Sequence, residues 1–433
     1  MTATSLPAAA LGPARAARPA RAVERRARAV LHGILAGLER GRLTIVDGDG
    51  EWAAGRMTDA FPLAATVHVH DPAFYPAVVF GGNVGVGRAY GEGLWSADDL
   101  VTAVRILAAN QAALGRLDGG LSWLLKPLDR AVHWRNRNTR AGSQRNIAAH
   151  YDLGNDFFAL FLDESLMYSC ACFEAEGMSL ADASRAKLDR ICRNLELVPG
   201  DRVLEIGCGW GGFAEHAAAR YGAQVTATTI SAAQRAYATE RIRRAGLAGQ
   251  VEVLGVDYRD LAGEYDRIVS IEMIEAVGAA QLPTFFRTAS RLLRPDGLMA
   301  LQAIVIPDRF YERARRSVDF IKRYIFPGSF LPSVGALTRA IGSASDLAVI
   351  QLDDLTPHYV ETLACWRERF RANQDRIAAL GYEEEFRRRW EYYFSYCEGG
   401  FRERVIGDVQ MLLAKPFWRG RAPRAAARAG GRT

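Results

Sequence analysis

The amino-acid sequence predicts an α/β fold in which a mostly parallel, Rossmann-like sheet is preceded by a small N-terminal α+β domain. Three observations support this prediction. An apolar run at residues 203–206 leads into a cluster of four glycines and then into a helical segment. From about residue 150, strand-like runs alternate with helices. Residues 23–117 instead combine short alternating strands with helices in a pattern of their own.

The glycine cluster is typical of a loop that binds a nucleotide-like ligand. Glu205 lies in the apolar run, and Gly207, Gly209 and Gly212 follow it with the spacing G-x-G-x-x-G. A brief apolar run bounded by turn residues indicates a parallel strand covered on both faces. Glycines then allow the backbone to approach a ligand closely. A turn that binds nothing is the alternative, but it would need only one or two glycines.

The next expected strand distinguishes two classes of cofactor. A dinucleotide site needs an acid at the end of that strand to bind the ribose hydroxyls, whereas residues 228–231 are Thr-Thr-Ile-Ser. The loop also lacks the lysine of a P-loop. The polar side chains available to bind a cofactor are Glu205 before the loop and Gln234 on the following helix. We therefore expect S-adenosylmethionine rather than a dinucleotide.

The alternation after residue 150 also predicts individual elements. A helix is expected at residues 231–245, with Ser231 as its N-cap, because serine accepts hydrogen bonds from the unpaired N–H groups of a first turn. Ligands of such sheets bind beyond the carboxyl ends of the strands. The expected strands are residues 202–206, 225–230, 251–256, 267–271 and 298–306.

The segments around this sheet differ in composition. We expect basic tails at residues 1–22 and 419–433, and a basic, aromatic linker helix at residues 118–149. The tryptophan, leucine and cationic side chains of that linker would suit either a membrane interface or docking between domains. Residues 307–400 exceed what the sheet needs, and they carry enough aromatic side chains to wall an apolar pocket.

Composition restricts the classes of protein. The 433 residues are 49% hydrophobic and 24% charged, which is ordinary for a globular chain of two domains. No apolar run approaches the roughly 20 residues that span a bilayer. The net charge of +6 would suit anionic lipid, nucleic acid or solubility alone. Six scattered cysteines predict a reducing cytoplasm. His68 and His70 lack a third ligand nearby, so no metal site is expected.

Four separated motifs carry a resemblance to a known family. They are HYDLGNDFF at residues 150–158, YSCA at 168–171, EIGCGWGG at 205–212 and YIFPG at 324–328. In this order they resemble the cyclopropane-fatty-acyl-phospholipid synthase family, over roughly residues 23–418. The resemblance implies a class I methyltransferase fold at residues 150–418.

The resemblance also implies roles for individual residues. Those that would bind S-adenosylmethionine are Tyr168 and Ser169 at its amino-acid end, Glu205, Gly207 and Gly209 at the loop, Ile230 and Gln234 at the ribose, and Tyr258 and Ile271 at the adenine. In that family a bicarbonate ion beside the transferred methyl acts as the base. Its cradle would be Cys170, Glu275, Gln302, Ile304 and Tyr359.

Two positions depart from the family pattern. Ala276 and Gln302 stand where better-known members have histidines. A glutamine can donate a hydrogen bond to an anion, but it cannot become cationic or relay a proton. We therefore expect either the same base with a different route for the released proton, or a different product after methyl transfer.

The implied reaction is transfer of a one-carbon unit to a cis double bond of a phospholipid acyl chain. Cyclopropane formation is the leading prediction, and methylene or methyl branching is the alternative. A small-molecule methyltransferase and a lipid- or nucleic-acid-binding protein with a vestigial site are the other classes. The expected setting is the cytoplasmic face of the membrane, without a specific nucleic-acid partner. A homodimer and, for a branched product, a reductase are candidate partners.

Overall fold

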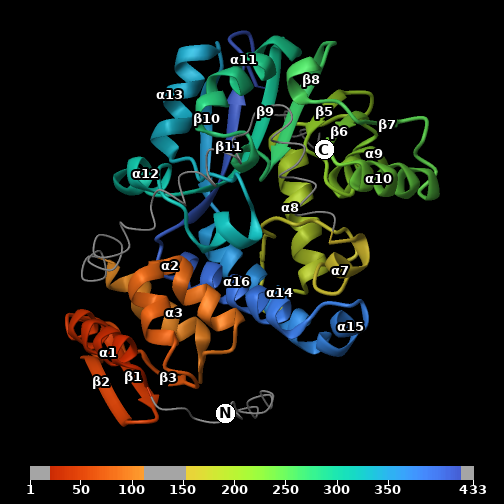
Figure 1. The fold of residues 1–433 in the computed structure, drawn as a ribbon. Helices are drawn as coiled ribbons and strands as arrows, with labels where there is room; N and C mark the ends of the chain where they lie inside the picture. The colour runs from red at the N-terminus through yellow and green to blue at the C-terminus, as the bar shows by residue number, and fades with distance from the viewer. Residues whose placement is uncertain (1–19, 112–152, 421–433) are drawn as a thin grey trace, which may run out of the picture. The chain divides into compact units, whose positions relative to one another are not determined.

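The computed structural model describes residues 20–111 and 153–420, in two compact units (Figure 1). The predicted linker at 118–149 lies outside the described residues. One unit combines the N-terminal residues up to Glu164 with residues 305–331 and 355–408, and the other holds residues 165–304, 332–354 and the C-terminal segment. The domains expected from the sequence, at residues 23–117 and 150–418, have different limits from these two units. The expected boundaries stay a prediction.

The second unit is built on a sheet of seven strands in the order β10-β11-β9-β8-β5-β6-β7. Strands β5 to β9 pair in parallel with their neighbours, while β10 and β11 pair antiparallel. This mostly parallel sheet confirms the predicted fold class. The strands are β5 Arg202–Ile206, β6 Gln224–Thr228, β7 Val251–Leu254, β8 Tyr265–Ile271, β9 Leu293–Val305, β10 Ala348–Asp354 and β11 Gly407–Ala414.

Helices cover this sheet, with α11 and α13 to one side of the strands and α9 and α10 to the other (Figure 1). Val203 and Leu204 of β5 are fully buried, as a strand covered on both faces requires. Ser231 caps α10 as predicted, because its side chain accepts a hydrogen bond from the N–H of Gln234. The helices are α8 Leu180–Asn194, α9 Gly212–Tyr221, α10 Ala232–Arg244, α11 Leu282–Leu292 and α13 Val334–Ala344.

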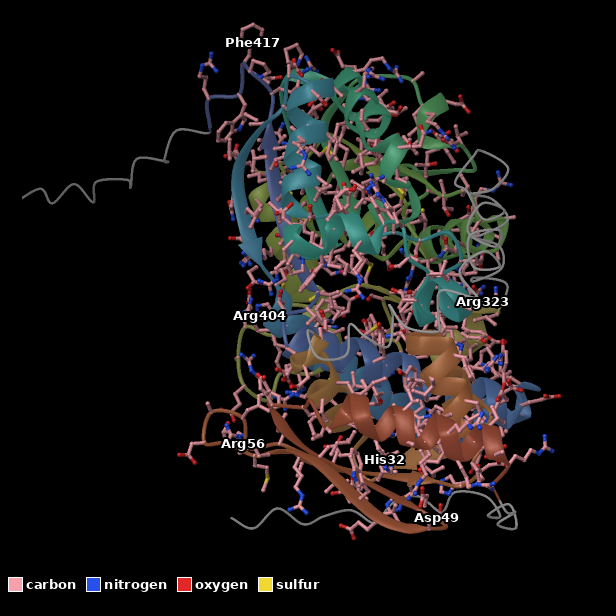
Figure 2. The ribbon with its side chains drawn as sticks, turned by 60° about the vertical axis from the view of Figure 1, so that its left-hand side comes forward. His32, Asp49, Arg56, Arg323, Arg404 and Phe417 are labelled. Carbon is pink, nitrogen blue, oxygen red and sulfur yellow. The ribbon has the colours of Figure 1, made fainter. Side chains whose placement is uncertain are left out.

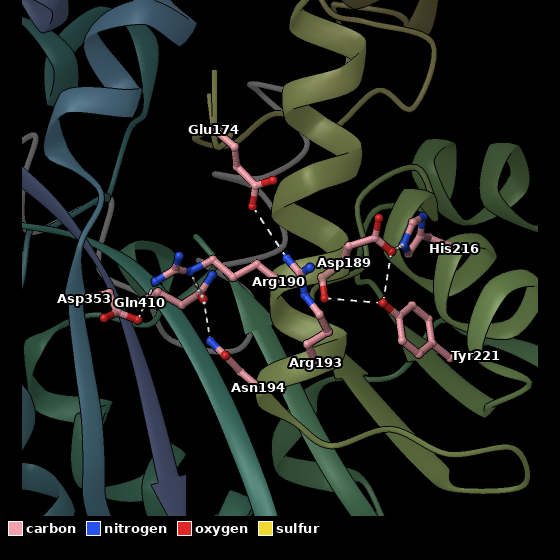
Figure 3. Close-up of polar contacts among 9 residues, drawn as sticks. All are labelled: Glu174, Asp189, Arg190, Arg193, Asn194, His216, Tyr221, Asp353 and Gln410. Carbon is pink, nitrogen blue, oxygen red and sulfur yellow. Dashed lines mark hydrogen bonds and ion pairs between the residues drawn. The ribbon is translucent and has the colours of Figure 1, made fainter. Parts of the chain in front are cut away.

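Polar contacts join α8 to helix α9 on one side and to strands β10 and β11 on the other (Figure 3). Towards α9, Asp189 accepts hydrogen bonds from the Tyr221 hydroxyl and pairs with His216. Towards β10 and β11, Arg190 forms an ion pair with Asp353 at 2.7 Å, and its Nε donates to Oε1 of Gln410 at 3.3 Å. These contacts hold Gln410, on β11 beside the edge strand, in one orientation.

The first unit begins with helix α1 Ala22–Leu35 on a four-stranded sheet of order β2-β1-β3-β4. His32, labelled in Figure 2, stacks on Trp52 of β2 with ring centroids 4.0 Å apart. The glycine-rich residues 81–87 lie within α2, which is kinked where Gly82 takes a non-helical φ of 53°. The remaining elements are β1 Gly41–Asp47, β2 Gly50–Arg56, β3 Ala64–Val69, β4 Trp95–Ala97, α2 Phe74–Gly91 and α3 Leu100–Ala109.

The aromatic residues of the 307–400 region pack within this first unit. Helix α16 contacts α2, α3 and α14. Rings of Phe157, Phe161 and Trp390 meet edge to face or tilted, with centroids 4.7–5.7 Å apart, and such pairs add to the free energy of burial. The elements are α7 Asn155–Ala159, α12 Asp308–Ala314, a π-helix Ile321–Ile325, α14 Thr356–Ala372, α15 Gln374–Ala379 and α16 Glu384–Arg402. No described helix is both long and apolar enough to cross a membrane.

Close packing of α2 against this aromatic region gives a test of the first unit. A Cβ on Gly87 would lie 2.2 Å from Phe320 and 2.8 Å from Tyr392, whereas a Cβ on Gly81 of the same helix would meet nothing within 4 Å. We expect Gly87→Ala to lower the free energy of unfolding by about 1–3 kcal/mol through overpacking. Gly81→Ala should stay within about 1 kcal/mol of the parent. Denaturant unfolding followed by circular dichroism measures both, and equal values would contradict this packing.

Candidate active site at the carboxyl edge of the parallel sheet

The glycine loop is fastened to the neighbouring strand where β5 ends. The N–H groups of Gly207 and Cys208 both donate to the carbonyl of Thr228, the last residue of β6, at 2.9 Å. Gly207 has a φ of 86°, and a Cβ there would lie 2.4 Å from Cγ of Met273. Glycine is therefore required at this position by both backbone conformation and space.

Gln234 faces this loop from α10. Its side chain is 4% exposed, and its Oε1 accepts a hydrogen bond from the Thr229 hydroxyl at 3.0 Å. A Cβ placed on Gly209 would lie 4.0 Å from Nε2 of Gln234. The amide therefore presents its donor end to the loop, where it suits a ligand hydroxyl.

A buried lysine, Lys187, hydrogen-bonds Ser169 and attracts the carboxylate form of Glu205. Lys187 of α8 is fully buried, and its Nζ donates to the Ser169 hydroxyl at 2.7 Å. Burial raises the pKa of Glu205 to about 8, against the attraction of Lys187 and a hydrogen bond from the N–H of Ala214. Among the described residues, Oε2 of Glu205 is buried without a hydrogen-bond partner. This carboxyl is thus mostly protonated at neutral pH.

The residues expected at the adenine lie on neighbouring segments. Tyr258 starts a 3-10 turn, Tyr258–Asp260, after β7, and its ring meets Phe285 edge to face at 5.4 Å. Its hydroxyl is buried and has no partner within the described part of the chain. Ile271 ends β8 and is 8% exposed. Ile230 and Tyr168 are half-buried, and the roles expected for all of them stay predictions.

Glu272, which the sequence analysis did not single out, lies at the centre of a polar cluster. Its Oε1 accepts hydrogen bonds from the N–H of Cys170 and from Nε2 of Gln302, both at 2.8 Å. Its own N–H donates to the Gln302 carbonyl at 2.9 Å. An acid placed directly after a buried strand, at the edge where ligands bind, was the available signal.

Glu275 occupies the adjoining turn, Ile274–Ala276. Its Oε1 accepts a hydrogen bond from the N–H of Ile304 at 2.6 Å, while Oε2 is buried and has no partner among the described residues. Burial, followed by the negative charge of Glu272, raises the pKa of Glu275 to about 8. At neutral pH this carboxyl is mostly protonated and can donate a hydrogen bond.

The structure brings together four of the five residues expected to cradle an anion. Glu272 accepts hydrogen bonds from Cys170 and Gln302, and Glu275, three residues further on, accepts one from Ile304. The fifth, Tyr359, lies on α14 in the first unit, where its ring stacks on Phe401 with centroids 4.4 Å apart.

The two expected cofactors fit these residues differently. The close approach at Gly207 and the Gln234 amide suit S-adenosylmethionine, which would supply an electrophilic methyl group. Bicarbonate does not fit as the resemblance places it, because the N–H groups of Cys170 and Ile304 and the Gln302 amide already donate to Glu272 and Glu275.

The Gln234 amide can be tested by ligand binding. Gln234→Ala should weaken the Kd for S-adenosylmethionine by about five-fold, since a hydrogen bond to a ligand hydroxyl contributes about 1 kcal/mol. Gln224→Ala, on the exposed first residue of β6, should leave the Kd unchanged. Isothermal titration calorimetry measures both, and an unchanged Kd for Gln234→Ala would rule out a ribose contact.

The protonated Glu205 predicts how stability depends on pH. Its folded pKa of about 8 exceeds the ordinary value of 4.5, so the stability gained by keeping it neutral is complete below pH 4.5 and is lost as pH rises towards 8. Glu205→Gln should abolish that loss. Between pH 5.5 and 8, the parent should lose about 3 kcal/mol more free energy of unfolding than the variant does. Parallel denaturant titrations check this, and identical pH profiles would contradict the buried neutral carboxyl.

Known proteins resemble this chain over most of its length. The mycolic acid cyclopropane synthetase family matches residues 138–411. The tuberculostearic acid methyltransferase UfaA1 of Mycobacterium tuberculosis is 39% identical over 86% of this chain and 87% of its own length. The cyclopropane-fatty-acyl-phospholipid synthase of Escherichia coli strain K12 is 38% identical over 81% of this chain and 88% of its own.

A solved structure agrees with these matches. Mycolic acid cyclopropane synthase CmaA1 complexed with SAH and CTAB superposes with a TM-score of 0.59 at 35% identity, covering 63% of this chain and 98% of that one. The resemblance inferred from the four sequence motifs is thereby confirmed, as is the class I methyltransferase fold. The chain belongs to the mycolic acid cyclopropane synthetase family of S-adenosylmethionine-dependent lipid-modifying enzymes.

Proposed function

We propose that this protein transfers a one-carbon unit from S-adenosylmethionine to the cis double bond of an unsaturated phospholipid acyl chain and closes a cyclopropane ring. The observation that carries this proposal is the pair of carboxyl groups on Glu272, directly after the end of β8 at Ile271, and on Glu275 in the next turn. The proposed setting is the surface of the membrane, in keeping with the net charge of +6.

The reaction explains why a buried carboxyl pair is useful. An isolated alkene is a weak nucleophile, so the enzyme must hold it in line with the sulfonium methyl and exclude water. The alkene π electrons form the new C–C bond, the C–S electrons remain on sulfur, and a carbocation develops on the neighbouring carbon. A group at the site must then accept one proton. If that proton leaves the new methyl, its C–H electrons close the three-membered ring.

A second candidate product is a methylene-branched acyl chain. It would arise if a neighbouring chain carbon lost the proton, and a reductase would be needed to give a saturated methyl branch. Two observations favour it: Gln302, which cannot relay a proton, stands in the cluster, and a relative at 39% identity is named as a tuberculostearic acid methyltransferase. The transfer step is the same for both products.

The products can be distinguished after incubation with S-adenosylmethionine and vesicles of a cis-unsaturated phospholipid. Mass spectrometry and proton NMR of the recovered fatty acids should show the gain of one CH2, loss of the alkene signal and upfield ring protons. Exocyclic methylene signals with the same mass gain would support the branched product instead. Vesicles of a saturated phospholipid are the matched control and should gain no mass.

The same assay decides whether a lipid is the substrate. If S-adenosylmethionine binds and the unsaturated lipid gains no mass, the lipid proposal is wrong, and a small-molecule methyltransferase becomes the better hypothesis.

A further inference from the structure

The polar cluster at the end of β8 carries its own anion. We propose that Glu272 supplies, from within the chain, the negative group that the family resemblance assigns to bicarbonate, so that methyl transfer by this protein needs no added bicarbonate. This inference rests on the proposed function and specifies the proton acceptor of that same site.

The first support is the use of the donors. The cradle expected for bicarbonate offers the N–H groups of Cys170 and Ile304 and the amide of Gln302. Glu272 takes the N–H of Cys170 and one amide hydrogen of Gln302, both at 2.8 Å, while the other points to the Cys170 carbonyl at 3.4 Å. Glu275 takes the N–H of Ile304 at 2.6 Å. A carboxylate of the protein thus sits where two of these donors converge.

The second support is a chain of hydrogen bonds that fixes the direction of the Gln302 amide. Arg190 can only donate, so it holds Oε1 of Gln410 towards itself at 3.3 Å. Nε2 of Gln410 then donates to Oε1 of Gln302 at 3.4 Å. Nε2 of Gln302 is left to face Glu272. The cluster is therefore arranged to bind an acceptor at this point, and Glu272 is that acceptor.

The third support is the backbone of Glu272 itself. Its φ of 47° lies in the left-handed region, where a side chain is disfavoured and glycine is not. Backbone conformation alone would favour glycine here. The glutamate must be explained by its side chain, which accepts hydrogen bonds from Cys170 and Gln302.

The charge of the cluster is consistent with this role. The negative charge of Glu272 helps to raise the pKa of Glu275 to about 8, so a charge on one carboxyl disfavours a charge on the other. A bound bicarbonate would bring a further negative charge beside them. With Glu272 as the acceptor, Glu275 can stay neutral and donate a hydrogen bond.

Glu272 and solvent are sufficient to accept the proton that the reaction releases. After the methyl has moved to the alkene carbon, a Glu272 carboxylate oxygen takes one proton from the carbocation intermediate. The C–H electrons close the ring, or form the new double bond of a branched product. The neutral products are the lipid and S-adenosylhomocysteine, and the protonated Glu272 returns its proton to solvent.

The first arm of the test measures initial rates of methyl transfer to unsaturated phospholipid vesicles by the unmodified protein. Rates are compared in buffer purged of carbon dioxide and in the same buffer with bicarbonate added. The inference predicts rates equal to within about two-fold. A rate that depends on added bicarbonate by about ten-fold or more would overturn it. No lipid methylation under either condition would overturn the proposed function itself, which is a different outcome.

The second arm removes the carboxylate. Glu272→Gly removes a side chain from a left-handed backbone position and leaves the Cys170 N–H and the Gln302 amide without this acceptor. We expect the rate to fall by about a hundred-fold or more in purged buffer. Added bicarbonate should restore it by at least about ten-fold. Glu196→Gly is the matched control, because Glu196 also has a left-handed φ, of 53°, but lies outside the cluster. It should keep the parental rate.

Binding of S-adenosylmethionine, measured for each protein, separates loss of the acceptor from loss of the fold. An active Glu272→Gly variant in purged buffer, or a variant that binds the cofactor and is not rescued, would contradict the role assigned to Glu272. If that variant does not fold, the bicarbonate dependence of the unmodified protein still decides the question.

Discussion

The site depends on one acceptor, the carbonyl of Thr228. Two N–H groups of the glycine loop converge on it, and they tie the end of β5 to the end of β6. This contact places Gly207 against Met273, where a side chain would not fit, and brings Gly209 near the Gln234 amide. Because both strands are paired in parallel and buried, the geometry of the loop follows from the sheet.

A second network of hydrogen bonds runs through two glutamine amides and ends at Glu272. It determines which residues donate and which accept in that part of the site. Arg190 orients Gln410, Gln410 orients Gln302, and Gln302 donates to Glu272. A glutamine amide can be oriented either way, but the guanidinium of Arg190 can only donate. Arg190 therefore fixes the orientation of both amides, so that Gln302 directs its N–H group at Glu272. Gln302 stands where the resemblance predicts histidine, and its amide donates a hydrogen bond to the carboxyl group of Glu272.

Much of this could be predicted from the sequence, for identifiable reasons. The strand at 202–206 and the Ser231 cap were predicted correctly because local patterns determine them. Strands β10 and β11 were missed: β10 is an edge strand with exposed Val349, Ile350 and Leu352, and β11 pairs only after a long insertion. Glu272 was missed because its one local signal, an acid directly after a buried strand, reveals neither its left-handed backbone nor its partners, which are distant in sequence.

We infer that the carboxylate of Glu272 is the anion that faces the transferred methyl. A crystal structure of the complex with S-adenosylhomocysteine, grown with bicarbonate present, tests it most directly. We predict that the cofactor's sulfur faces the Glu272 and Glu275 carboxyl groups, with the Cys170 N–H and Gln302 amide still bound to Glu272. A bicarbonate ion held by Cys170 and Gln302, with the Glu272 side chain displaced, would contradict the account.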